Sequence, residues 1–146
     1  MGNNPAELFK ETVRESYDWL RPAIHEGNKH KTNKAWCVGR KVIITRAFTN
    51  YGWGRLSLGE YAERNLIQVD KIFHLLDGAA FSDCTYTGDL VSDISSRDGK
   101  REGETGYFKW KAYQNGNLHL VFKREDLLKS YNQIAGGMIE PALKGW

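Results

Sequence analysis

A β-hairpin is predicted by the sequence Tyr107-Phe-Lys-Trp-Lys-Ala-Tyr-Gln-Asn-Gly-Asn-Leu-His-Leu-Val-Phe-Lys123. Its two halves are rich in aromatic and aliphatic residues and flank Gln114-Asn115-Gly116, a combination typical of a hairpin. A two-residue loop of Asn115 and Gly116 would set lysines opposite leucines. A three-residue loop with Gly116 in a left-handed conformation pairs Phe108 with Phe122, Trp110 with Leu120 and Ala112 with Leu118. Because this second register gathers one apolar face, it is the predicted one.

The opposite face of the hairpin would carry polar side chains around Val121. They are Tyr107, Lys109, Lys111, Tyr113, His119 and Lys123. Bases can stack on tyrosine while lysine binds the backbone, so the pattern is compatible with a nucleic-acid surface. Lysine and tyrosine are also ordinary residues on the solvent side of an antiparallel sheet. Both interpretations stay open from the residues alone.

Apolar residues recur at helical spacing in four segments of the chain. It predicts a helix over 5–20 that ends near Pro22, a helix from Asn65 to Asp77-Gly78, a short helix over 89–95, and a helix over 124–134. Strands are predicted within 36–48 and over 55–58, and loops over 26–35 and 95–106. A parallel sheet would need strands that alternate with crossover helices. We therefore expect one α+β domain over 1–146, with an antiparallel sheet that includes the C-terminal hairpin and is packed by helices on one face.

The charge of the chain is concentrated in residues 21–55, here called the basic segment. Against the single acid Glu26, the segment holds Arg21, Lys29, Lys31, Lys34, Arg40, Lys41, Arg46 and Arg55. It therefore carries +7, whereas the other residues sum to −4 and the whole chain to +3. Such a cluster is typical of a polyanion site. A solvated, lysine-rich connector would have the same composition.

Several function classes find no support in the motifs. The chain lacks a phosphate-binding GxxxxGK[ST] sequence, a GxSxG nucleophile elbow and a CxxC pair, and no run of about 20 apolar residues is present. Cys37 and Cys84 stand apart, which favours a reducing cytoplasm. A metal nuclease needs clustered carboxylates, and the densest acidic stretch of the chain is the place to look for them. Its acids have no ordered spacing, so we interpret it as a solvated loop. Its members are Asp83, Asp89, Asp93, Asp98, Glu102 and Glu104. We expect no catalytic residue, no metal and no cofactor.

Two parts of the chain resemble a known family. The sequence from Leu58-Gly-Glu-Tyr-Ala-Glu-Arg to Leu-Asp-Gly78, and the hairpin with the following Arg124-Glu-Asp-Leu-Leu128, are similar to an uncharacterised phage and plasmid domain family. The resemblance covers about 57–137 and leaves the basic segment outside. Members of that family often accompany adenine-specific DNA methyltransferases. The resemblance implies a role close to DNA modification or to conflict between phage and host. It does not imply that the chain is itself a methyltransferase, because the Asn/Asp-Pro-Pro-Tyr/Phe sequence of such enzymes is missing.

These observations predict a non-enzymatic, DNA-associated accessory protein of a phage or plasmid, in the cytoplasm of the bacterial host. The residues expected to bind nucleic acid are Lys29, Lys31, Lys34, Arg40, Lys41, Arg46, Trp53, Arg55, Lys109, Lys111, Tyr113, His119 and Lys123. The alternative is a counter-defence protein that binds and inhibits a host protein complex, with Trp36, Trp53 and Trp146 as anchors. A host defence protein or a DNA methyltransferase would then be a partner, and a small nuclease is a third option.

Overall fold

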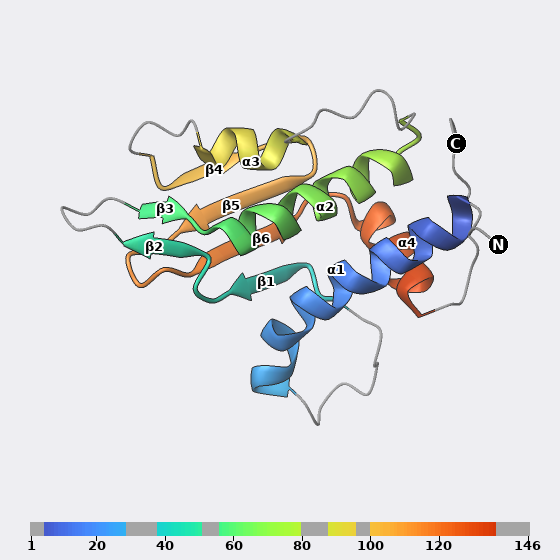
Figure 1. Cartoon of the computed structure of the whole chain (residues 1–146), viewed down its shortest axis with the longest axis horizontal. Coiled ribbons are helices and arrows are strands. Elements are labelled where there is room, and N and C mark those ends of the chain that lie inside the picture. Colours follow the sequence, from blue (N-terminus) through green and yellow to red (C-terminus); the bar gives the residue numbers. More distant parts are fainter. Residues whose placement is uncertain (1–4, 29–37, 51–55, 80–87, 96–99, 137–146) are drawn as a thin grey trace.

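A four-stranded antiparallel sheet forms the centre of the computed structural model, which describes residues 5–28, 38–50, 56–79, 88–95 and 100–136. The strand order is β1 (Lys41–Ile44), β6 (Leu118–Phe122), β5 (Phe108–Ala112) and β4 (Glu102–Glu104). β2 (Phe48–Asn50) and β3 (Leu56–Leu58) form a separate two-stranded sheet. Four helices are described: α1 (Pro5–Asn28), α2 (Glu60–Leu76), α3 (Gly88–Ser95) and α4 (Glu125–Ala135). The predicted α+β class is confirmed (Figure 1).

The hairpin adopts the predicted register. Phe108 pairs with Phe122, Trp110 with Leu120 and Ala112 with Leu118, and all six side chains are buried. The three-residue loop is closed by the Tyr113 N–H, which donates to the Asn117 carbonyl at 2.9 Å. Gly116 has a φ of +95°, the left-handed conformation that glycine adopts without steric cost. Its carbonyl also accepts the N–H groups of Ala47 and Phe48, so the loop fixes the start of β2.

The core lies between one face of this sheet and the helices. The Phe73 ring of α2 packs against Phe108, Phe122 and Tyr131, with ring centroids 5.3, 5.3 and 5.5 Å apart. On α1, Phe9, Val13, Tyr17 and Leu20 follow the helical spacing of apolar residues that predicted this helix, and all four are buried as well. Because strand residues alternate between faces, the side chains between these buried positions lie on the opposite face of the sheet.

Three predicted boundaries were wrong. The first helix continues past Pro22 to Asn28. A proline costs the helix one backbone hydrogen bond, but its φ is compatible with helical geometry, so it does not have to end the helix. α2 begins at Glu60 rather than at Asn65, whose side-chain amide donates to the Tyr61 carbonyl inside the helix. The single strand predicted within 36–48 is divided into β1 and β2 by a turn in which Arg46 has a φ of +57°.

The predicted loop over 95–106 is also partly wrong, because it contains β4. This strand pairs Gly103 with Trp110, and the Trp110 Nε1–H donates to Asp93 Oδ2 of α3 at 2.7 Å. A Cβ on Gly103 would lie 2.6 Å from that indole nitrogen, so only glycine leaves room for the ring to cross the strand. The short helix predicted over 89–95 and the helix predicted over 124–134 are confirmed as α3 and α4. Residues 29–37, 51–55 and 96–99 lie outside the described residues, and they hold most of the first predicted loop, part of the second and the starts of the two predicted strands.

Candidate nucleic-acid interface

The side of the four-stranded sheet opposite the helices is here called the outer face. Register places its side chains in two rows across the strands. One row contains Lys41, Val121, Lys109 and Glu104, and the other contains Ile43, His119, Lys111 and Glu102. Lysines on β1 and β5 therefore stand on both sides of the uncharged residues of β6.

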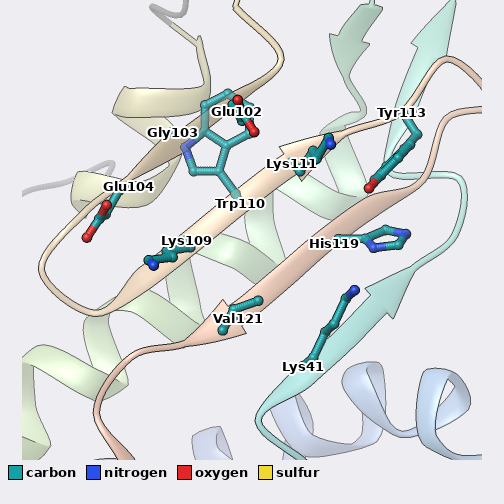
Figure 2. Close-up of a pocket in the computed structure, with 10 residues that line it drawn as sticks. All are labelled: Lys41, Glu102, Gly103, Glu104, Lys109, Trp110, Lys111, Tyr113, His119 and Val121. Carbon is teal, nitrogen blue, oxygen red and sulfur yellow. The ribbon is translucent and has the colours of Figure 1, made fainter.

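Most of these side chains surround one hollow of about 410 Å³. Its lining includes Lys41, Lys109, Lys111, Tyr113, His119, Val121, Glu102 and Glu104 (Figure 2). In Figure 2, Tyr113, His119 and Lys41 follow one another on the β6 and β1 side, whereas Lys109 and Lys111 extend from β5. Residues of four strands, as far apart in sequence as 41 and 121, thus contribute to one surface.

An aromatic pair lies at the hairpin end of the hollow. The rings of Tyr113 and His119 have centroids 4.3 Å apart and planes tilted by 42°. Lys111 Nζ lies 5.3 Å from the centre of the Tyr113 ring, within the range of a cation–π contact. Burial lowers the pKa of His119, and the charges of Lys41 and Lys111 lower it further. Both effects favour the neutral form of the His119 ring, and among the described residues its Nδ1 has no hydrogen-bond partner.

Acidic residues of β4 limit the positive charge of the outer face. Glu102 is paired across the strands with Lys111, and Glu104 with Lys109. The Glu104 carboxylate also accepts a hydrogen bond from Lys123, and this contact holds its pKa below the ordinary value. Lys123 donates in addition to the Thr105 carbonyl at 2.8 Å, at the edge of the sheet. Lys41, Lys109 and Lys111 are thus the lysines that line the hollow itself.

The remaining residues expected to bind nucleic acid are placed elsewhere or not described. Arg40 precedes β1 and lines a groove beside α4 with Leu128 and Asn132, away from the hollow. Arg46 is exposed in the turn after β1. Lys29, Lys31, Lys34, Trp53 and Arg55 lie outside the described residues, as do Trp36 and Trp146. The structure therefore brings the hairpin residues together with Lys41 of the basic segment.

Tyr107 departs from the predicted outer face. Its hydroxyl donates to Asp77 Oδ2 at 2.8 Å, and its ring meets the edge of the His74 ring at 4.8 Å. Burial, followed by the bond to Asp77, raises the Tyr107 pKa, and the Asp77 pKa is lowered chiefly by the same bond. Since Tyr107 precedes β5, strand alternation does not constrain it, and it joins the hairpin to the end of α2.

Glu102, Glu104 and Ile43 are outer-face residues that sequence reasoning did not assign to the site. The two glutamates fell within the predicted loop. Their spacing of two residues is the period of a strand and would put both on one face, but only the pairing of β4 with β5 places them beside the lysines. Ile43 follows from the alternation of Val42 and Ile44 and is 39% exposed.

A second polar cluster joins α2 to α3. Asp70 is fully buried and accepts the Leu90 N–H through Oδ2 at 3.1 Å, so it caps the first turn of α3. His74 Nε2 lies 3.2 Å from Asp89 Oδ2 and 3.6 Å from Asp70 Oδ1. Burial raises the pKa of Asp70, although the N–H of Leu90 and the nearby His74 partly oppose this effect. The cluster fixes how the two helices meet.

The described part of the chain contains no candidate for a metal site or for a membrane-spanning helix. Within it, no group of three or more His, Cys, Asp or Glu side chains is arranged to hold a metal ion. Of the helices described, none combines the length and apolar character needed to cross a membrane.

Comparison with known proteins identifies a family but no individual relative. No curated protein and no solved structure matches the chain. A family model described as a domain of unknown function, DUF4942, matches residues 1–139. The match includes the basic segment, which the resemblance seen in the sequence had left outside. Since it covers nearly the whole chain, the protein belongs to the DUF4942 family of domains of unknown function.

Proposed function

We propose that this protein is a non-enzymatic, DNA-associated accessory protein of a phage or plasmid that binds nucleic acid through its outer face. One observation carries the proposal. Lys41, Lys109 and Lys111 surround the same hollow as the aromatic pair Tyr113 and His119. Lysines that hold phosphates beside rings that can stack on bases are the two components of sequence-tolerant nucleic-acid binding.

The charges of the face support a moderate, salt-sensitive affinity. Lysine charges outnumber the carboxylates of Glu102 and Glu104 around the sheet, but the excess is small. Each phosphate neutralised by a lysine releases condensed counterions, so binding strengthens as salt is lowered. Residues of the basic segment outside the described ranges would add to this attraction, and replacing Lys29, Lys31 and Lys34 together with glutamate measures their share.

The cellular setting belongs to the same proposal. Similarity of the hairpin and of the α2 region to proteins that accompany adenine-specific DNA methyltransferases supports a role beside DNA modification in mobile elements. A protein without a catalytic domain would act there by holding DNA or by contacting the methyltransferase. Co-purification of the full chain with an adenine-specific DNA methyltransferase, before and after nuclease treatment, separates the two routes.

Direct binding measurements test the proposal. The full chain is titrated into labelled single-stranded and duplex DNA at low and high salt, and electrophoretic shift and fluorescence anisotropy report the affinity. The variant K109Q/K111Q removes two lysines of the hollow, and R64Q/K129Q removes two exposed charges of α2 and α4. We expect the first variant to bind at least tenfold more weakly at low salt, and the second to bind like the natural protein.

Two results would overturn the proposal: no binding at low salt, or equal weakening by the two double variants. A partner protein is the second candidate, and it is favoured by Ile43, an aliphatic side chain 39% exposed on the same face. In that case I43D would abolish capture of a host protein, whereas nuclease treatment and the lysine variants would leave the capture intact.

A further inference from the structure

We infer that the outer face binds single-stranded rather than duplex nucleic acid, with one base stacked at the Tyr113–His119 pair and the backbone crossing β6 between lysines. This inference rests on the proposed function and adds the form of the ligand. Four features of the described residues lead to it: the shape of the face, the spacing of its lysines, the aromatic pair and the carboxylates of β4.

The shape of the face favours a ligand with unpaired bases. Proteins that read duplex DNA insert a helix or a two-stranded ribbon into a groove. The lysines and aromatic residues described here instead line a hollow of about 410 Å³ on the face of a sheet. Because a recessed surface cannot enter a groove, the bases have to reach it, and the bases of a single strand are free to do so.

The spacing of charges defines a path for the backbone. β6 carries the uncharged Val121 and His119, with Lys41 on the strand at one side and Lys109 and Lys111 on the strand at the other. Strands lie about 4.8 Å apart, so the two sets of lysines are separated by about 10 Å. A strand that crosses β6 would place phosphates near both sets and a base over the uncharged strip between them.

The aromatic pair provides the stacking surface. Tyr113 lines the hollow, its ring is held against His119 at 4.3 Å, and Lys111 brings a positive charge to the same ring. His119 contributes a neutral ring, because burial and two neighbouring lysines disfavour its protonation. Base stacking on such rings tolerates any base, so we expect little sequence preference.

The carboxylates of β4 disfavour a second backbone. Glu102 is exposed at one edge of the hollow and Glu104 lies two residues further along the same edge strand. A duplex presents phosphates on two strands and at twice the linear charge density of one strand. A second backbone lying over β4 would meet these carboxylates, whereas the phosphates that Lys41, Lys109 and Lys111 hold would lie near β1 and β5.

The test compares one ring with matched controls. A labelled single strand of about 15 nucleotides and a duplex of the same sequence are titrated with the full chain and with variants Y113L, Y113F and Y61L. Tyr61 is 65% exposed on α2 and serves as the control tyrosine. We expect the single strand to bind at least tenfold more tightly than the duplex. Y113L should weaken single-strand binding about tenfold, whereas Y113F and Y61L should bind within about twofold of the natural protein.

The outcomes separate this inference from the proposed function. Equal affinity for duplex and single strand, or a Y113L variant that binds as the natural protein does, overturns the inference. If K109Q/K111Q still weakens binding in that case, the outer face remains the nucleic-acid surface. Absence of binding to either DNA at low salt overturns both. Thermal unfolding of each variant tests whether the sheet is intact, and Y113F distinguishes loss of the ring from loss of the hydroxyl.

Discussion

The salt dependence of single-strand binding is predicted to report how many lysines of the hollow contact phosphates. Lys41, Lys109 and Lys111 line it, whereas Lys123 is occupied by Glu104 and the Thr105 carbonyl. Each phosphate contact on a single strand contributes about −0.7 to the slope of log affinity against log salt. The three contacts of the hollow contribute about −2 to the slope, and the single one left in K109Q/K111Q contributes about −0.7; contacts of the basic segment add equally to both.

These slopes translate into affinities that are easily distinguished. Between about 50 and 200 mM salt the hollow contacts should cost the natural protein about 20-fold in affinity and K109Q/K111Q about 2.5-fold, in addition to a loss from the basic segment that is common to both. Fluorescence anisotropy with a labelled single strand at three salt concentrations in this range gives both slopes. R64Q/K129Q, which carries the same change in net charge, should keep the natural slope. Equal slopes for the natural protein and K109Q/K111Q would refute the assignment of the two lysines to phosphate contacts.

Three further changes probe the edge strand and the buried carboxylate. E102Q removes a carboxylate from the hollow and should raise single-strand affinity about threefold at low salt; an unchanged or weaker affinity would contradict this. G103A should lower the free energy of unfolding by about 1–3 kcal/mol in urea, because its Cβ would lie 2.6 Å from the crossing indole nitrogen. G39A is the control, since no atom approaches its added Cβ within 4 Å, and equal effects would contradict the predicted crowding. The pKa of Asp70 is raised in the fold, so ionisation should destabilise the natural protein as the pH rises from the unfolded value near 4 through the folded one. D70N cannot ionise and should lack this loss, so parallel unfolding curves at pH 4 to 7 would argue against it.

Much of the fold could be predicted because its signals are local. Alternation of apolar residues and the left-handed glycine at 116 specify the hairpin within one short run, and its register was correct at every pair. The boundary errors arose where a local signal competed with packing. Pro22 resembles a helix end, yet the helix continues, and Asn65 resembles a helix cap, yet it lies in the second turn of α2.

The candidate site could be predicted only in the part that one element carries. Lys109, Lys111, Tyr113 and His119 share a face by strand alternation, which sequence spacing reveals. Lys41 joins them because β1 pairs with β6, a contact between residues about 80 positions apart that no local pattern records. Glu102 and Glu104 were missed for the same reason: a short polar run around a glycine becomes a strand only when β5 offers it a partner.

In the hairpin, the residues that contribute to the core and those that form the outer face occupy alternate positions of the sequence. Even-numbered residues from 108 to 122 within the two strands are buried, and the odd-numbered ones face outward. A library randomised at the odd positions could therefore change what the protein recognises while leaving its interior untouched. An insertion of one residue within β5 would have the opposite consequence, since it would exchange lysines for aromatic rings along the rest of that strand.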